Sequence, residues 1–270
     1  MAASAGRVRV RKNGQGGLLL QILQYAVFPC FLLLTWELSV RWRWVPNTLI
    51  ASPSQVLSKF FTMLGDGRLL EHSLVSLRRL FLGFSLGTGL GVFAGTLVGY
   101  SRLGARLFEP SLLGLIPVPP IAWIPLLVIL FGIGEISKIA LISIGSFCTL
   151  FLQAAYGIRS ADKELVEVGY VLEKGNLSLL FKILLPSALP SILSSMRVAM
   201  ALSWTLLMAS EIIASSQGLG WLMWNARNFS RPDDMIVGMV TVGILGKLTD
   251  SMLVALEKYL TRWRQTYRDK

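Results

Sequence analysis

Charged residues are scarce in this sequence. Asp, Glu, Lys and Arg make up 15% of the 270 residues, whereas hydrophobic residues make up 53%. A soluble domain usually carries about a quarter charged residues. Apolar stretches recur that are long enough to cross a hydrocarbon core about 30 Å thick as helices. The shortage of charge therefore indicates an all-α, polytopic membrane protein, because a backbone in lipid must satisfy its own hydrogen bonds.

Histidine and cysteine are almost missing. The single histidine, His72, excludes a multi-histidine metal site, and we expect no bound metal. Cys30 and Cys148 both lie in apolar stretches, where small packing residues are a better interpretation than a disulfide.

Enzyme motifs are missing too. The sequence contains no G-x-x-x-x-G-K-[ST], no H-E-x-x-H and no G-x-S-x-G, which are patterns of phosphate-binding loops, zinc proteases and serine hydrolases. We therefore expect no catalytic residues. If ATP drives this protein, another chain must bind it.

Positive charge exceeds negative charge, giving a net charge of +11. In a soluble protein this excess would suggest a nucleic-acid or acidic partner. Here it is better explained by Lys and Arg in cytoplasmic loops and tails. No soluble basic domain is present, so we expect no nucleic-acid partner.

Six membrane helices are predicted, over residues 18–40, 77–99, 108–131, 136–157, 187–213 and 235–256. With both termini in the cytoplasm, the inner segments hold fifteen Lys and Arg and the outer segments hold seven. The predicted division is a cytoplasmic tail (1–17), a first span (18–40), a periplasmic segment with a surface helix (41–76), a core (77–256) with an inner loop (158–185), and a second cytoplasmic tail (257–270).

Glycines repeat every fourth residue in the second predicted span. Such a spacing places them on one stripe of the helix, where another helix can approach closely. Tight helix packing is the plainer interpretation, and sliding of helices during gating is the alternative. The stripe consists of Gly83, Gly87, Gly91, Gly95 and Gly99.

Prolines interrupt the third predicted span at Pro117, Pro119, Pro120 and Pro125. Each proline removes a backbone donor, and such a break persists only where protein or water covers the freed carbonyls. A broken helix often lines a translocation path, although a kink needed for packing is equally compatible. The pathway candidates are Pro119, Pro120, Trp123, Trp204 and Glu211.

Few charges lie within the predicted spans, and those that stand out are Glu37, Arg197, Glu211 and Lys247, with Glu135 near the end of a helix. An ionisable group inside a membrane indicates a functional site unless it is paired. We expect local ion pairing for most of them. Glu211 is the best candidate for a carboxylate that lines the pathway or stabilises a gate.

The inner loop contains a predicted short helix with an apolar face of Leu165, Val166, Val168 and Leu172. Ser160 or Asp162 can cap its start, and Gly175-Asn176 can end it. A helix lying on the cytoplasmic surface with an apolar face needs a partner groove or rests on lipid.

This loop resembles that of binding-protein-dependent ABC permeases, whose motif is E-A-A, three residues, G, nine residues, I-x-L-P. Glu167, Ile183 and Leu185-Pro186 match at the family's spacing. Val168-Gly169 replace the two alanines, Glu173 replaces the glycine, and Gly175 follows two residues later. The coupling residues that the resemblance implies are Leu165, Val166, Glu167, Val168, Gly169, Leu172, Glu173, Gly175, Ile183 and Pro186.

Three further stretches, PVPPIAWIPLLVILFGIGEISKI, SEIIASSQGLGWLMWNARNF and LEKYLTRW, resemble the taurine, aliphatic sulfonate, nitrate and bicarbonate branch. The resemblance implies a type I ABC importer permease fold in the bacterial inner membrane. It also implies a second permease copy, two ATPase subunits carrying ATP and Mg²⁺, and a periplasmic or lipid-anchored binding protein. The implied cargo is a small anion, sulfonate or taurine first and nitrate or bicarbonate next. A stand-alone carrier or channel is the alternative.

Overall fold

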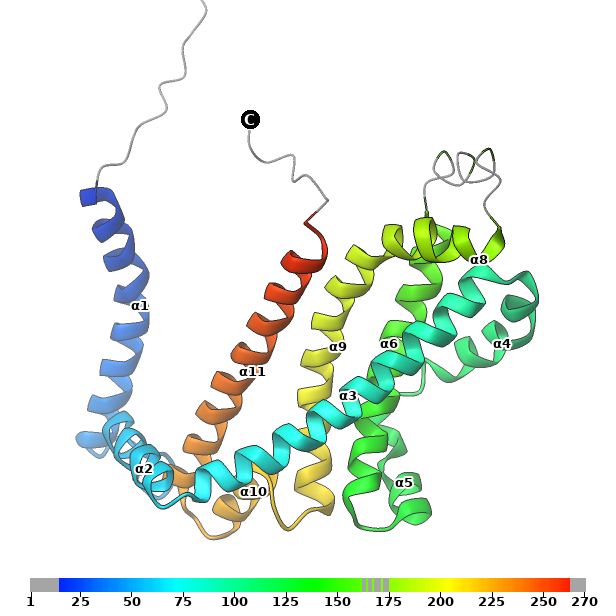
Figure 1. Cartoon of the computed structure of the whole chain (residues 1–270). Coiled ribbons are helices and arrows are strands. Elements are labelled where there is room, and N and C mark those ends of the chain that lie inside the picture. Colours follow the sequence, from blue (N-terminus) through cyan, green and yellow to red (C-terminus); the bar gives the residue numbers. More distant parts are fainter. Residues whose placement is uncertain (1–14, 162–163, 165–166, 168–170, 172–174, 263–270) are drawn as a thin grey trace, which may run out of the picture.

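The structure is a computed structural model that describes residues 15–161, 164, 167, 171 and 175–262 (Figure 1). All regular structure within these residues is helical. The helices are α1 (Gln15–Arg41), α2 (Pro53–Gly65), α3 (Arg68–Tyr100), α4 (Arg102–Leu115), η1 (Pro120–Trp123), α5 (Ile124–Phe131), α6 (Glu135–Arg159), α8 (Asn176–Leu179), η2 (Leu180–Leu184), α9 (Leu185–Ala214), α10 (Leu219–Asn228) and α11 (Pro232–Leu260).

Four helical segments of the described chain are long and apolar enough to cross a membrane: α3, α6, residues 180–214 and α11. They contain the predicted spans 77–99, 136–157, 187–213 and 235–256. The predicted span 108–131 is instead a pair of helical segments, Arg102–Leu115 and Pro120–Phe131, bent by 86° and together able to form a fifth span. The first predicted span falls in α1, whose side chains are described only from Val27 onward.

Prolines explain the bend between α4 and α5. Pro117, Pro119 and Pro120 donate no backbone hydrogen bonds, so an α-helix cannot continue through them. Pro120 instead occupies the first position of the short 3₁₀-helix η1, where a missing N–H costs little.

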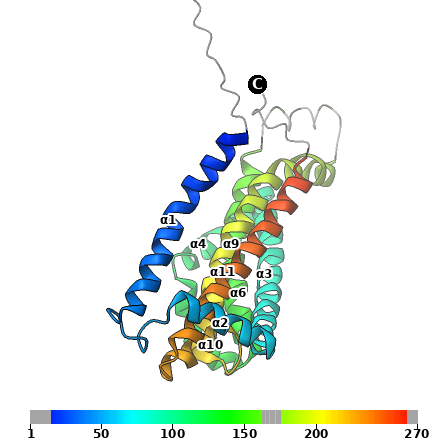
Figure 2. The same ribbon diagram turned by 90° about the vertical axis from the view of Figure 1, so that its left-hand side faces the viewer.

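The helices run between two ends of the molecule (Figure 1). We call one the α8 end, where α1 begins and α11 ends, and the other the α10 end, where α2 lies across the bundle. Figure 2 shows that α1 stands apart from the other helices. Its Glu37 carboxylate accepts hydrogen bonds from the Ser54 backbone N–H (3.1 Å) and hydroxyl (2.9 Å) of α2.

The start of α2 is specified locally. Ser52 and Gln55 form a capping box, and Pro53 stands at the first position of the helix. Val56 and Met63 are buried while Leu57 and Phe61 are exposed, so α2 packs on the bundle through one face. This amphipathic helix lies where the sequence predicts a surface helix.

The glycine stripe of α3 faces α6 in the core. A Cβ atom added to Gly91 would lie 2.8 Å from the carbonyl oxygen of Phe147, and one added to Gly99 would lie 2.8 Å from that of Ala155. Real side chains cannot approach a backbone so closely. The stripe therefore lets the two backbones touch.

Candidate functional site

A buried cluster of charges joins α3, α6 and α9 near the α10 end. We call the buried side chains Arg79, Lys138 and Glu211, together with the exposed carboxylate of Glu135 at their edge, the buried charge cluster. Glu211 is fully enclosed, and its carboxylate accepts hydrogen bonds from the Arg79 guanidinium (2.8 Å), the Ser76 hydroxyl (2.8 Å) and the Gly220 backbone N–H (2.8 Å). These three donors replace the water that the enclosed carboxylate has lost, as a buried charged group requires. In this conformation Glu211 thus faces the interior of its own chain.

Arg79 connects this carboxylate to two more elements. Its guanidinium donates to Glu135 at the start of α6 (2.7 and 2.5 Å) and to the carbonyl oxygen of Gln217 (2.7 Å). The Lys138 ammonium lies 3.7 Å from Glu135 and donates to the Gly134 carbonyl oxygen (3.1 Å). Two cations thus balance two carboxylates, as a buried ionic group requires.

The cluster also fixes the turn between α9 and α10. Gly218 has φ +116°, and the Glu211 carboxylate occupies the space where a Cβ would project, so only glycine fits. The Gly218 N–H donates to Nδ1 of His72 (3.2 Å), and the Leu219 N–H donates to the Ser76 hydroxyl (2.8 Å). α3 therefore holds the first residues of α10 in place.

Sequence reasoning finds the two carboxylates of this cluster but not their partners. Glu211 is noted as a charge within a span and Glu135 as a charge near a helix end, whereas Arg79, Lys138 and the neighbouring Ser76 are not singled out. The sequence does contain one signal for this pairing. Arg79 and Glu211 lie in two apolar helices, and opposite charges inside a membrane usually pair with each other.

The bend between α4 and α5 encloses an apolar cavity of about 190 Å³. Trp123 lines it together with Phe147 and Phe151 of α6 and with residues of α4. Pro119 is exposed at the bend, and Pro120 is half-buried. Trp204 is distant in sequence and buried, and its indole N–H donates to the Thr249 hydroxyl of α11 (3.1 Å).

The predicted coupling residues are only partly described. Leu165, Val166, Val168, Gly169, Leu172 and Glu173 lie outside the described residues. Glu167 has helical backbone and an exposed side chain, as do Glu164 and Val171. Ile183 lies in η2, a π-helical turn that leads into α9 at Leu185-Pro186. Because Pro186 and Pro190 lack backbone N–H groups, regular α-helical bonding is interrupted here, and a wider turn fits.

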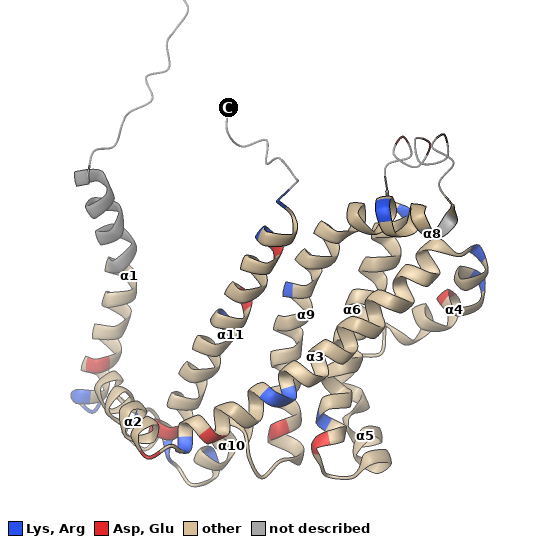
Figure 3. Ribbon diagram, in the orientation of Figure 1, with Lys and Arg blue, Asp and Glu red and all other residues tan. Residues whose placement is uncertain are grey.

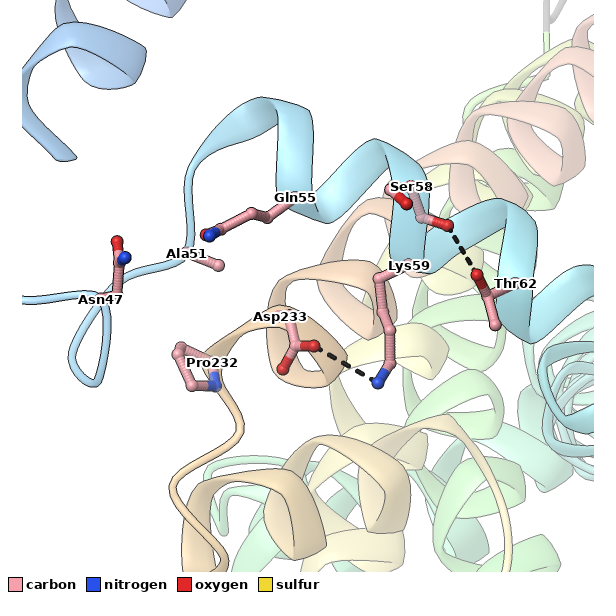
Figure 4. A pocket seen from close by; sticks show the side chains of 8 residues that line it. All are labelled: Asn47, Ala51, Gln55, Ser58, Lys59, Thr62, Pro232 and Asp233. Carbon is pink, nitrogen blue, oxygen red and sulfur yellow. Dashed lines mark hydrogen bonds and ion pairs between the residues drawn. The ribbon is translucent and has the colours of Figure 1, made fainter. Parts of the chain in front are cut away.

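Charged residues lie toward the two ends of the bundle and also partway along α9 and α11 (Figure 3). At the α10 end, Lys59 of α2 pairs with Asp233 (3.3 Å) and Asp234 (3.1 Å) at the start of α11. Figure 4 shows Lys59 beside Asp233 in an open pocket of about 410 Å³. The hydrogen bond with Asp234 raises the pKa of Lys59 above its ordinary value of 10.5. These pairs fasten α2 to α11.

Replacing Lys59 by methionine is expected to lower the free energy of unfolding by about 0.2–1 kcal/mol at neutral pH, as for other partly exposed ion pairs. Because the pKa is raised on folding, the stabilisation is fully present below pH 10.5 and disappears as the pH rises through the folded-state pKa. Thermal unfolding of both proteins between pH 7 and 11.5 measures this difference. A difference that grows with pH would contradict the assignment.

Comparison with known proteins gives the family. The family described as "Binding-protein-dependent transport system inner membrane component" matches residues 87–262. The putative aliphatic sulfonates transport permease SsuC of Bacillus subtilis is 35% identical over 241 residues, covering 89% of this chain and 87% of that protein. The taurine transport system permease TauC of Escherichia coli is 32% identical over 237 residues, covering 86% of each.

Solved structures agree on the fold. An inward-facing structure of the MetNI methionine ABC transporter contains a chain that matches with a TM-score of 0.59 and 20% identity, covering 70% of this chain and 94% of that one. The chain thus belongs to the permeases of binding-protein-dependent ABC importers, multi-pass inner-membrane subunits that are not themselves enzymes and that work with an ATPase and a substrate-binding protein.

Proposed function

We propose that this permease carries a small sulfonate, such as taurine or an alkanesulfonate, into the cell, driven by ATP hydrolysis on partner subunits. The observation that carries the substrate class is the similarity to SsuC and TauC along almost the whole chain. Nitrate and bicarbonate remain the competing anions within the same branch.

The assembly we propose has two copies of this chain, two ATPase subunits and one periplasmic or lipid-anchored binding protein, all in contact with membrane lipid. We place the α8 end in the cytoplasm, with both termini, and keep the division into tails, first span, periplasmic segment and core at the boundaries given above. In support, α1 begins and α11 ends at the α8 end (Figure 1), and the predicted inner segments hold more Lys and Arg than the outer ones.

Coupling to the ATPase is assigned to residues 164–175, around Glu167. Glu167 is exposed and lies in the chain between α6 and α8, at the family's spacing from Ile183 and Leu185-Pro186. α8, η2 and α9 follow one another directly, so a displacement of this segment acts on the start of a membrane-spanning helix. α9 then runs to Glu211 in the buried charge cluster. Movement of the coupling segment is thereby linked to the α10 end through one helix.

The test is uptake by liposomes that contain the whole complex and its binding protein. Taurine or an alkanesulfonate should be imported only with ATP, and nitrate and bicarbonate should not compete. If nitrate or bicarbonate is imported and the sulfonates are not, the proposed substrate is wrong. Ion-driven uptake by liposomes holding only this chain would instead support a stand-alone carrier.

The coupling assignment is tested separately, by reversing Glu167 to arginine. We expect uptake and substrate-stimulated ATP hydrolysis to fall together by about tenfold or more, because the charge faces the ATPase groove. Lys258→Glu reverses an exposed charge near the α8 end of α11 and serves as the control, since it should leave both activities near those of the wild type. Unchanged transport by Glu167→Arg would remove Glu167 from the coupling surface.

A further inference from the structure

Three charged side chains lie in the middle of the membrane-spanning helices, away from the buried charge cluster. They are Arg197 of α9 and Lys247 and Asp250 of α11, which we call the mid-membrane cluster. At 1.5 Å per residue, Lys247 lies about 22 Å along the helix from Pro232 and about 20 Å from Leu260. Neither end of α11 is within reach of its side chain.

Positive charge is in excess in this cluster. The Arg197 guanidinium donates to both oxygens of Asp250, through Nε (2.8 Å) and Nη2 (3.2 Å), in a bidentate pair. Nζ of Lys247 lies 3.8 Å from the same carboxylate, beyond hydrogen-bond distance, and its side chain is 77% exposed. Two cations therefore share one carboxylate. Glu257, the other acid acting on Arg197, lies about 10 Å further along α11, toward the α8 end.

The face of α11 that carries Lys247 is not covered by the rest of the chain. Only 11% of the most apolar 18-residue window of α11 is buried, against 39–44% in the other three spans. Gly243 and Ser251, which share this face one turn away on either side, are exposed. Bare lipid is an unfavourable neighbour, because a charge at the bilayer centre costs about 2.5–3.5 kcal/mol even on the most lenient scales. A charge on this face is therefore favoured only if the assembled transporter places a polar group or water beside it.

A rigid support holds the cluster in place. Trp204 of α9 donates to Thr249 of α11, which is adjacent to Asp250 in sequence. The bidentate pair and this bond lock α9 and α11 together at the same level. The exposed ammonium of Lys247 thus lies beside an ion pair that is held in place by α9 and α11.

We propose that Lys247 and Arg197 bind the oxyanion group of the solute during its passage, so that the mid-membrane cluster is an anion site in the translocation pathway. This inference rests on the proposed function, since a sulfonate carries one negative charge spread over three acceptor oxygens. The ammonium of Lys247 supplies up to three donors and the charge that Asp250 leaves uncompensated. Asp250 keeps the site weak by neutralising one of the two cations, and a transit site must release what it binds.

The test compares Lys247→Met with Lys258→Met in the reconstituted complex with its binding protein, using taurine and an alkanesulfonate as probes. Lys258 is an exposed lysine nearer the end of the same helix, so the control removes the same charge outside the membrane centre. We expect Lys247→Met to reduce the uptake rate by about tenfold. ATP hydrolysis stimulated by the binding protein should stay within about twofold of wild type, which shows that the complex still assembles. Lys247→Arg should restore uptake.

The outcomes separate the two proposals. If the wild type imports the sulfonates and Lys247→Met imports them equally well, the anion site is wrong and the proposed function stands. If Lys247→Arg fails as completely as Lys247→Met, the charge is not what matters and the site is again wrong. If the wild type imports neither sulfonate, the proposed substrate fails, and the site assigned to it fails with it.

Discussion

Replacing Arg79 by methionine is expected to lower the free energy of unfolding by about 3–5 kcal/mol, the typical effect of removing one partner from a buried ion pair. Glu211 would stay fully enclosed without its guanidinium, and the Gln217 carbonyl would lose one of its two donors, keeping only the Ser215 hydroxyl. Glu135 would suffer less, because its side chain is 55% exposed and Lys138 lies nearby. Thermal or denaturant unfolding in detergent measures the change.

A double-mutant cycle isolates the pair from general damage to the core. Arg79→Met combined with Glu211→Leu removes both charges, so the double variant should be more stable than either single variant. Arg68→Met is the matched control, because Arg68 lies on the same helix but pairs with Asp66 at an exposed position. That variant should change stability by about 0.5 kcal/mol or less. Additive effects of Arg79→Met and Glu211→Leu would contradict the assignment.

The geometry of the buried charge cluster explains why it sits at this end of the molecule. Glu211 lies near the end of α9, Glu135 begins α6, and residues 217–220 precede and begin α10. One guanidinium on α3 thereby ties three elements that hydrophobic packing alone would leave free to slide in a membrane. A displacement of α9 that begins at the α8 end would therefore act on the buried charge cluster.

Hydropathy and local chemistry account for much of the fold. The four described spans follow from runs of apolar residues, the bend follows from prolines, and the start of α2 follows from Ser52, Pro53 and Gln55. The contact of the glycine stripe with α6 agrees with the packing interpretation of the four-residue spacing. In each case the information lies within one or two helical turns.

Long-range pairing could not be predicted in the same way. The polar stretch 68–76 led to a predicted span starting at residue 77, yet α3 begins at Arg68. Hydropathy predicts where the apolar part of the helix begins. α3 extends beyond that point, and its extra residues His72 and Ser76 contact the α9–α10 turn. The partners of Arg79 depend on the direction in which α3 crosses α6 and α9 (Figure 1), which no local pattern encodes.

Two single alanine substitutions on α3 are expected to change stability in opposite directions. Gly87→Ala should lower the free energy of unfolding by about 1–3 kcal/mol, because the new methyl group would strike the Ser143 carbonyl oxygen, and backbone cannot move aside cheaply. Gly89→Ala, two residues away, should raise it by about 0.5–1 kcal/mol, because nothing lies within 4 Å of its Cβ position and alanine favours the helix.

The pair of variants also decides between the two interpretations of the stripe. If the glycines serve packing alone, loss of transport in Gly87→Ala should match its loss of folded protein, and the folded fraction should work normally. If smooth contact lets α3 slide on α6, the folded fraction of Gly87→Ala should hydrolyse ATP yet transport slowly. Gly89→Ala should transport normally in both cases, because it leaves the α3–α6 contact unchanged. Destabilisation by both substitutions would show that α3 tolerates no added side chain on either face. The glycine stripe would then not differ from the rest of α3, and neither interpretation would be supported.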